Sequence, residues 1–229
     1  MRADRAGVTA PSRDAAVFHR SLPGYEPTPV HQLGELARAL GLATVLVKDE
    51  SNRLGLPAFK ILGASWAVER ALRERSDVQT LVAASAGNHG RAVAHVARRR
   101  GLSCRIFLPA RSADARRKAI ASEGAESVVV GGTYEDAVQA AADAGAESGV
   151  LEIADVGSSE PARSVIDGYA TLFEEAAEQA AFDVIVVPAG VGSLAAAAAR
   201  HGAEARIAVV AVEPVTAACL TASLAAGAR

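Results

Sequence analysis

Short runs of apolar residues alternate along the chain with segments whose apolar positions repeat at helical spacing. The apolar runs predict β-strands at residues 44–47, 80–84, 104–108, 127–130, 150–154, 183–187 and 207–212. The helical spacing predicts helices at residues 31–40, 60–74, 90–100, 113–123, 134–146, 160–181, 193–201 and 215–226. Strand and helix in alternation predict an α/β fold with right-handed crossovers and mostly parallel sheets flanked by helices. Ligands of such sheets bind beyond the carboxyl ends of the strands.

Composition narrows the class of partner. The chain has 229 residues, of which half are hydrophobic and only 4% aromatic, so the core is built mainly from small aliphatic side chains. A net charge of −2 favours small neutral or zwitterionic partners and argues against nucleic acid or an acidic membrane surface. No stretch has the length and hydrophobicity of a membrane span, and residues 1–14 do not have the pattern of a signal peptide. Cys104 and Cys219 lack metal-ligand spacing, so we expect no metal site and a cytoplasmic protein.

Lys60 has the most distinctive setting among the three lysines. Lys48 adjoins two acidic residues and Lys118 adjoins two arginines, so both have ordinary explanations as paired or solvated charges. Lys60 instead lies in the apolar run of residues 57–63, PAFKILG. An amine in apolar surroundings is disfavoured as ammonium, which lowers its pKa and suits an imine-forming lysine. The alternative is a snorkelling lysine at the start of a helix, with its amine in water.

A glycine-bearing loop follows the predicted strand 80–84 and opens the next helix. Its sequence is Ser85-Ala86-Gly87-Asn88-His89-Gly90. Glycine lets the backbone approach a ligand closely, and free N–H groups at a helix start suit a carboxylate. Asn88 adds a side chain that can both donate to and accept from a hydroxyl on a flat cofactor ring. A plain strand-to-helix turn with Ser85 and Asn88 as caps explains the same residues.

A second glycine loop follows the predicted strand 183–187. Its sequence is Pro188-Ala189-Gly190-Val191-Gly192-Ser193-Leu194. A glycine turn at a helix N-terminus is a phosphate cradle, and Ser193 adds a hydroxyl donor. The Gly-x-Gly pattern also fits a tight turn without a ligand. Glu213, about twenty residues further on, keeps a nucleotide-binding alternative open.

Lys60 comes first along the chain, followed by the loop of residues 85–90 and then by the loop of residues 188–194. Further characteristic tracts lie around them. The tracts are residues 47–53 (VKDESNR), Leu56, 58–60 (AFK), 62–63 (LG), 87–91 (GNHGR), 167–172 (DGYATL), 189–193 (AGVGS) and 212–214 (VEP). In this arrangement the chain resembles the fold type II pyridoxal-phosphate enzymes. It resembles diaminopropionate ammonia-lyase most, with threonine dehydratase as a near relative.

The resemblance implies a role for each matching residue. Lys60 would hold pyridoxal 5'-phosphate as an internal Schiff base and move protons, and Asn88 would hydrogen-bond the 3'-oxygen of the cofactor. The cofactor phosphate would be held by Gly190, Val191, Gly192 and Ser193. The substrate carboxylate would be held by Ser85, Ala86, Gly87, Asn88 and His89. Asp155 matches an acid/base aspartate of the ammonia-lyase, although a loop or capping aspartate is the ordinary alternative.

The resemblance also implies a reaction and an architecture. The cofactor acts as an electron sink, so that a small amino acid such as 2,3-diaminopropionate loses its α-proton and a β substituent. The aminoacrylate so formed hydrolyses to a 2-oxo acid and ammonia. Residues 1–75 and 156–229 would form the larger cofactor-binding domain, and residues 76–155 the smaller domain that binds the substrate carboxylate. The resemblance further implies a homodimer, and it places more sequence beyond Arg229.

One departure affects the substrate. Diaminopropionate ammonia-lyases carry an aspartate where this chain has Ala86, so the base that the resemblance implies for a D-isomer is missing. The Ser-Ala-Gly-Asn form is more like the dehydratases, which keeps threonine and serine open as substrates. Three hypotheses therefore stand: a pyridoxal-phosphate lyase, a shortened non-catalytic homologue, and a nucleotide-binding α/β domain.

Overall fold

The computed structural model describes residues 14–227. Its helices are α1 (Asp14–Arg20), α2 (Gly34–Leu40), α3 (Lys60–Glu74), α4 (Asn88–Arg100), α5 (Asp114–Ala121), α6 (Tyr134–Gly145), α7 (Glu160–Gly168), α8 (Ala170–Gln179), α9 (Ser193–Ala205) and α10 (Cys219–Ala226), with a 3-10 turn at Val215–Ala217. Its strands are β1 (Val30–Gln32), β2 (Leu46–Lys48), β3 (Thr80–Ala84), β4 (Ser103–Pro109), β5 (Glu126–Val130), β6 (Val150–Glu152), β7 (Val184–Pro188) and β8 (Ala208–Val212). The chain is an α/β protein, as predicted.

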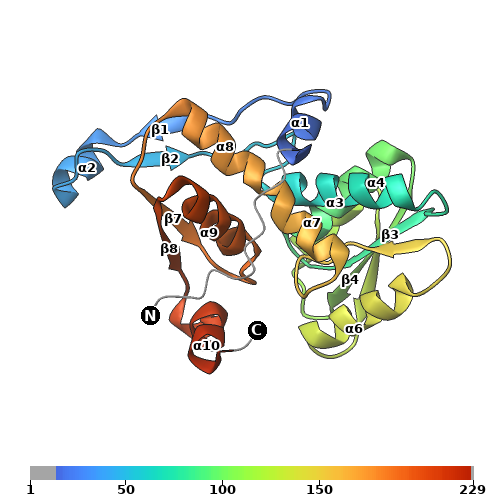
Figure 1. The fold of residues 1–229 in the computed structure, drawn as a ribbon. Coiled ribbons are helices and arrows are strands. Elements are labelled where there is room, and N and C mark those ends of the chain that lie inside the picture. The colour runs from blue at the N-terminus through green and yellow to red at the C-terminus, as the bar shows by residue number, and fades with distance from the viewer. Residues whose placement is uncertain (1–13, 228–229) are drawn as a thin grey trace.

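A parallel four-stranded sheet forms one half of the molecule, in the order β5-β4-β3-β6 (Figure 1). Alternate side chains of β3 point to opposite faces, because successive residues of a strand do so. Leu81 and Ala83 join the cluster under α3 and α4, whereas Val82 and Ala84 pack with α6. Helices therefore cover both faces of this sheet, and it lies within residues 76–155.

The other half contains two smaller sheets. Strands β7 and β8 pair in parallel with α9 as their crossover, and β1 and β2 pair antiparallel with α2 between them (Figure 1). Ile185 and Val187 of β7 are buried against α9, but Val184 and Val186 are 51% and 65% exposed. The β7–β8 sheet is thus covered on one face among the described residues. The division of the chain into a larger and a smaller domain stays a prediction.

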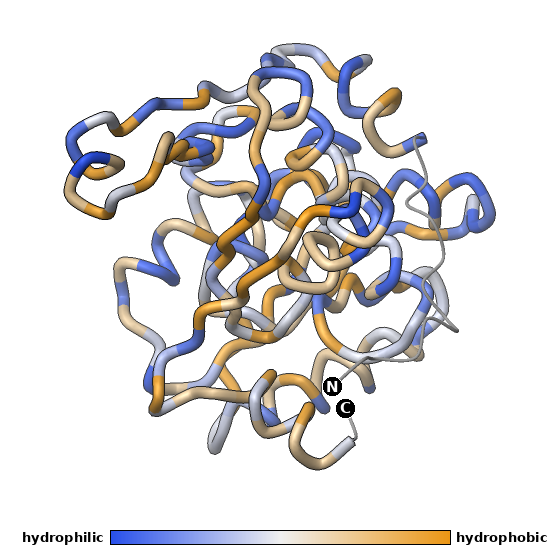
Figure 2. Tube along the Cα trace, turned by 60° about the vertical axis from the view of Figure 1, so that its left-hand side comes forward, coloured by the Kyte–Doolittle hydropathy of each residue, from blue (hydrophilic) through white to orange (hydrophobic). Residues whose placement is uncertain are grey.

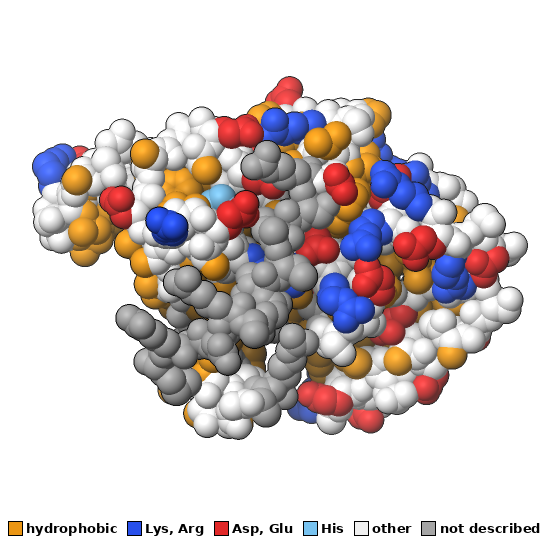
Figure 3. Space-filling view, in the orientation of Figure 1, with side chains coloured by type: hydrophobic (Ala, Val, Ile, Leu, Met, Phe, Trp, Pro, Cys, Tyr) orange, Lys and Arg blue, Asp and Glu red, His pale blue; other side chains and the backbone are white. Residues whose placement is uncertain are grey.

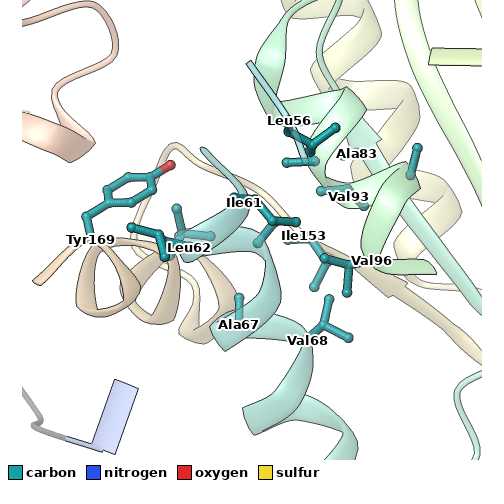
Figure 4. Close-up of a cluster of buried hydrophobic side chains, with 14 of the residues drawn as sticks. Leu56, Ile61, Leu62, Ala67, Val68, Ala83, Val93, Val96, Ile153 and Tyr169 are labelled. Carbon is teal, nitrogen blue, oxygen red and sulfur yellow. The ribbon is translucent and has the colours of Figure 1, made fainter. Parts of the chain in front are cut away.

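Helices α3 and α7 cross at two glycines. A Cβ atom on Gly168 would lie 2.6 Å from the carbonyl oxygen of Leu62, and one on Gly63 would lie 2.6 Å from Cε1 of Tyr169. Only glycine permits so close an approach. The crossing brings the start of α3 beside Tyr169, whose ring lies next to Leu62 at the edge of the core (Figure 4).

A buried ionic group, the Arg53 cluster, consists of Lys48, Glu50, Arg53 and Glu175 with Tyr25 and Thr28. The guanidinium of Arg53 donates to both carboxylate oxygens of Glu175, at 2.6 and 2.8 Å, and also to Glu50. Both the Arg53 and the Glu175 side chains are fully buried. Burial alone would raise the pKa of Glu175, but hydrogen bonds from Arg53, Lys48 and Tyr25 lower it to about 2. The cluster joins the loop that precedes α3 to helix α8.

Polarity separates the interior from the surface. Hydrophobic stretches of the trace run through the middle of the molecule, whereas hydrophilic stretches lie mostly at its outer turns and helices (Figure 2). On the face shown in Figure 3, charges of both signs intermingle without a large patch of one sign. This distribution agrees with the small net charge of the chain.

The predicted elements differ from the observed ones in four places. The predicted helix 215–226 is a 3-10 turn at Val215–Ala217 followed by α10. The predicted helix 31–40 begins as strand β1, because residues 30–32 pair with β2. The predicted helix 160–181 is two helices, α7 and α8, which meet at Tyr169. Helix α1 was not predicted, and its buried His19 bonds to Thr171 Oγ1 and to the Leu62 carbonyl. The predicted absence of a signal peptide concerns residues 1–14, almost all of which lie outside the described residues.

Candidate active site

Lys60 is the first residue of α3 and Asp155 lies three residues beyond the end of β6. Lys60 Nζ donates to Asp155 Oδ2 at 2.9 Å. The two side chains are only 18% and 9% exposed. The structure therefore brings together two residues that are 95 positions apart in the sequence and that the resemblance assigns to acid/base chemistry.

Two aromatic rings flank the amine. Lys60 Nζ lies 5.6 Å from the ring centroid of Phe59 and 5.4 Å from that of Tyr169, and the rings meet edge to face. The stem of Lys60 thus has the apolar surroundings expected from the sequence. Its amine does not, because it faces a carboxylate.

His89 is a further buried polar residue of the site, and it lies next to Asp155. Its Nε2 lies 2.7 Å from the carbonyl oxygen of Ile153, which can only accept, so Nε2 carries the proton. Its Nδ1 lies 3.9 Å from Asp155 Oδ2 and has no hydrogen-bond partner among the described residues. Burial lowers the pKa of His89 below its ordinary value. The His89 side chain therefore faces Asp155 as a neutral acceptor.

Asp155 is held as a carboxylate. Burial alone would raise its pKa, but the charge of Lys60 and the hydrogen bond that Lys60 donates lower it below the ordinary value. An ionised carboxylate beside an amine is a pair that can pass a proton over one hydrogen bond. Asp155 can therefore act as the partner of Lys60 in proton transfer.

The segment of residues 85–90 leads from the end of β3 into the first turn of α4, beside this pair. The Ser85 hydroxyl accepts a hydrogen bond from the Gly87 amide at 3.1 Å, and Gly87 and Asn88 are exposed. A Cβ atom on Gly90 would lie 2.4 Å from the Ser85 carbonyl oxygen, so glycine lets the loop fold back on the helix start. The N-terminus of α4 is thus open to a ligand, with Asn88 beside it.

The loop of residues 188–193 joins β7 to α9. Gly192 has a φ of 92°, in the left-handed region that favours glycine. A Cβ atom on Gly190 or Gly192 would meet nothing within 4 Å, so the loop borders open space. Ser193 is only 4% exposed, yet its hydroxyl has no hydrogen-bond partner among the described residues.

Two tyrosines at the site were not assigned a role from the sequence. Tyr169 is fully buried, and its hydroxyl has no hydrogen-bond partner within residues 14–227. Tyr134 lies with its hydroxyl 3.5 Å from the carbonyl oxygen of Ala84. Burial and the Asp155 carboxylate raise the pKa of both tyrosines, so both hydroxyls keep their protons. Tyr169 lies in the characteristic tract of residues 167–172, and that tract was the sequence signal that could have singled it out.

We call Lys60, His89, Asp155, Tyr169 and Ser193 the Lys60 cluster. These residues fit a phosphate-bearing aldehyde: an amine for the aldehyde, and a buried free hydroxyl at the N-terminus of a helix for the phosphate. The nucleotide alternative loses its acidic residue, because Glu213 accepts hydrogen bonds from the Leu220 and Thr221 amides at the start of α10.

Comparison with known proteins identifies the family of the chain. The sequence profile of the family described as "Pyridoxal-phosphate dependent enzyme" matches residues 22–229. Diaminopropionate ammonia-lyase of Escherichia coli K12 is 35% identical over 206 residues, which cover 79% of this chain and 52% of the relative. The biosynthetic L-threonine dehydratase of the same strain is 32% identical over 226 residues, which cover 97% of this chain and 41% of the relative.

The fold of the chain is also similar to that of a diaminopropionate ammonia-lyase. The crystal structure of the E. coli diaminopropionate ammonia-lyase, in complex with an aminoacrylate-PLP azomethine reaction intermediate, matches with a TM-score of 0.92 at 30% identity. The match covers all of this chain and 66% of that one. The chain thus spans about half to two thirds of the length of these ammonia-lyases. None of the described helices is long and apolar enough to cross a membrane.

The fold type II resemblance inferred from the sequence is confirmed by both comparisons. The family profile covers most of the chain, and the structural match extends over all of it. The chain belongs to the pyridoxal-phosphate-dependent enzyme family.

Proposed function

We propose that this protein is an ammonia-lyase that converts a small amino acid resembling 2,3-diaminopropionate to a 2-oxo acid and ammonia, with pyridoxal 5'-phosphate as cofactor. The observation that carries the proposal is the 2.9 Å contact between Lys60 Nζ and Asp155 Oδ2. An elimination needs one group to remove the α-proton and one to protonate the leaving group. This pair supplies both at one place.

The residues that hold the cofactor follow from the site. The Lys60 amine would bind its aldehyde carbon, Asn88 would bond its 3'-oxygen, and Gly190, Val191, Gly192 and Ser193 would bind its phosphate. Open space over the loop and the free hydroxyl of Ser193 support the phosphate assignment. When bound, the cofactor supplies an electron sink for the electron pair left by the α-proton.

The protein's own groups then move the protons. Lys60 Nζ takes the α-proton, and the hydrogen bond to Asp155 provides a path by which that proton passes to Oδ2. Asp155 can then protonate the departing β-amine, which leaves as ammonia. The released enamine takes up water and gives the 2-oxo acid and a second ammonia. His89 Nδ1 lies 3.9 Å from Asp155 Oδ2 without a hydrogen bond, so we assign His89 no step in this proton transfer.

The substrate carboxylate is assigned to the N-terminus of α4. Ser85, the backbone at Ala86 and Gly87, and the exposed Asn88 border it. Helix-start amides favour an anion. This assignment puts carboxylate binding in the proposed smaller domain, residues 76–155, and the phosphate loop in the proposed larger one. We further propose a cytoplasmic homodimer, on the basis of the resemblance.

Ala86 supports a second candidate function, elimination of water from threonine or serine. A methyl group at position 86 supplies no base, so the proton chemistry falls to Lys60 and Asp155. Loss of a hydroxyl needs the same protonation as loss of an amine. The intact pair speaks against a non-catalytic remnant.

The test is a substrate comparison on the purified chain loaded with pyridoxal phosphate. Formation of 2-oxo acid would be followed with L- and D-2,3-diaminopropionate, L-serine and L-threonine. We expect the L-diaminopropionate rate to be highest, the D-isomer rate to be low, and Lys60→Ala to abolish both activity and the visible absorption band. Preference for threonine or serine would establish the second candidate. A bound cofactor without turnover of any of the four would overturn both.

A further inference from the structure

Tyr169 is a buried polar group that no step above uses. Its side chain is 0% exposed and its hydroxyl has no hydrogen-bond partner among the described residues. Burying a hydroxyl without a partner is unfavourable, and most buried polar atoms in proteins are satisfied. The unsatisfied phenol therefore needs an explanation other than stability.

The position of Tyr169 is set by the backbone around it. It lies where α7 ends and α8 begins, and its ring occupies the space left by the missing side chain of Gly63. Phe59 packs edge-on against the ring, at 5.1 Å between centroids. Figure 4 shows the ring beside Leu62 of α3. The ring is thus held in place by its neighbours on both sides.

The surroundings of the hydroxyl identify what it faces. The ring centroid lies 5.4 Å from Lys60 Nζ, and α9, which begins at Ser193, packs against both of the helices that meet at Tyr169. Ser193 is also buried, and its hydroxyl is also without a partner among the described residues. Two free hydroxyls therefore lie on elements that pack together at the start of α9. Both can donate, since Tyr169 keeps its proton.

A single group would satisfy both hydroxyls and the helix-start amides. It must accept several hydrogen bonds, carry negative charge and lie within reach of the Lys60 amine. A phosphate monoester meets these requirements. An uncharged cofactor edge or a substrate methyl would leave the two hydroxyls unsatisfied.

We propose that the Tyr169 hydroxyl is a further phosphate donor, which acts with Ser193 to bind the cofactor phosphate and links the helix of Lys60 to the phosphate loop. This inference rests on the proposed function, because it takes the ligand to be pyridoxal phosphate. It adds a residue from the α7–α8 junction to a site otherwise built from a glycine loop.

The test compares two ligands on Tyr169→Phe, which keeps the ring and removes only the hydroxyl. Dissociation constants for pyridoxal phosphate and for pyridoxal, which lacks the phosphate, would be measured by absorbance titration. We expect the variant to bind pyridoxal phosphate about tenfold more weakly and pyridoxal within about twofold of the wild type. Equal weakening of both, or of neither, would overturn the inference.

Tyr25→Phe is the matched control. Tyr25 donates its hydroxyl to Glu175 in the Arg53 cluster, away from the phosphate loop. Without cofactor, we expect Tyr25→Phe to lower the melting temperature and Tyr169→Phe to leave it unchanged or raise it, because only the first removes a satisfied hydrogen bond. If Tyr169→Phe lowered the melting temperature as much as Tyr25→Phe does, Tyr169 would have a structural role instead.

A third measurement separates this inference from the proposed function. Inorganic phosphate would be titrated against the melting temperature of the wild type, Tyr169→Phe and Lys60→Ala. We expect phosphate to stabilise the wild type and Lys60→Ala alike, and Tyr169→Phe less. If pyridoxal phosphate fails to react with Lys60 while this pattern holds, the proposed function fails and the anion site stands. Equal stabilisation of all three proteins would overturn the role of Tyr169.

Discussion

The Arg53 cluster and the Lys60 cluster are both buried and both ionic, but they differ in how their polar atoms are satisfied. In the first, the Arg53 guanidinium bonds Glu175 and Glu50, and no side-chain atom of the cluster is a buried atom without a partner. In the second, His89 Nδ1 and the hydroxyls of Tyr169 and Ser193 have no partner within residues 14–227.

This difference separates a structural role from a functional one. A saturated network gains stability from every bond and offers nothing to a ligand. An unsaturated one is less favourable in the free protein, and its free donors and acceptors become useful once a ligand arrives. We therefore expect the Arg53 cluster to govern stability and the Lys60 cluster to govern chemistry.

The largest expected effect on stability follows Arg53→Met. The substitution leaves the buried carboxylate of Glu175 without its bidentate partner, and breaking a buried pair from one side costs about 3–5 kcal/mol. The free energy of unfolding from urea titration measures it. Arg20→Ala, which breaks the exposed Arg20–Glu178 pair, is the control and should cost less than about 1 kcal/mol. If Arg53→Met and Arg20→Ala lowered the free energy of unfolding equally, the Arg53 cluster would not be the stabilising element that the comparison takes it to be.

A smaller effect is expected from pH, through His19. Burial lowers its pKa from 6.5 to about 4, and both ring nitrogens are engaged in hydrogen bonds. Between these two values the unfolded chain binds a proton that the folded protein does not. Stability is therefore fully present above pH 6.5, and about 3 kcal/mol of it is lost as the pH falls to about 4.

Unfolding titrations across this range, on the wild type and on His19→Gln, check the prediction. The variant should show a flatter dependence on pH between 6.5 and 4, because the titrating group is gone. A dependence of the same steepness in both proteins would show that another group causes the acid sensitivity.

The smallest effect on stability is expected from Asp155→Asn, whose main effect is on turnover. The amide keeps the shape of the side chain but cannot receive the proton from Lys60, so we expect turnover to fall about 100-fold or more. The free energy of unfolding should fall by less than in Arg53→Met, since Lys60 and Asp155 share one hydrogen bond whereas Arg53 and Glu175 share two. A loss of stability as large as that of Arg53→Met, with turnover kept, would reverse the roles of the two clusters.

Local sequence signals predicted much of the fold. Strand β3 and helix α3 have the predicted bounds, because their apolar patterns are strong and their ends carry clear signals. The break at Tyr169 was missed because one glycine, Gly168, does not by itself end a helix, and the break depends on the crossing of α7 over Gly63. Strand β1 was missed because its three residues are strand only through pairing with β2.

The candidate site likewise contains residues that the sequence predicted and contacts that it could not predict. Lys60 and the two glycine loops are recognisable as motifs, and the resemblance pointed to Asp155. The contact between Lys60 and Asp155, and the unsatisfied state of Tyr169, are tertiary facts with no local signature. The pairing of Arg53 with Glu175, 122 positions apart, was out of reach for the same reason.

The central claim is that the Lys60 amine bonds the cofactor aldehyde, and it is tested most directly by trapping that bond. The chain would be incubated with pyridoxal phosphate, reduced with borohydride, digested and examined by peptide mass spectrometry. We predict a phosphopyridoxyl group on the peptide that contains Lys60, and none on that peptide in Lys60→Ala. A group found on Lys48 or Lys118 instead, or on no lysine, would contradict the account.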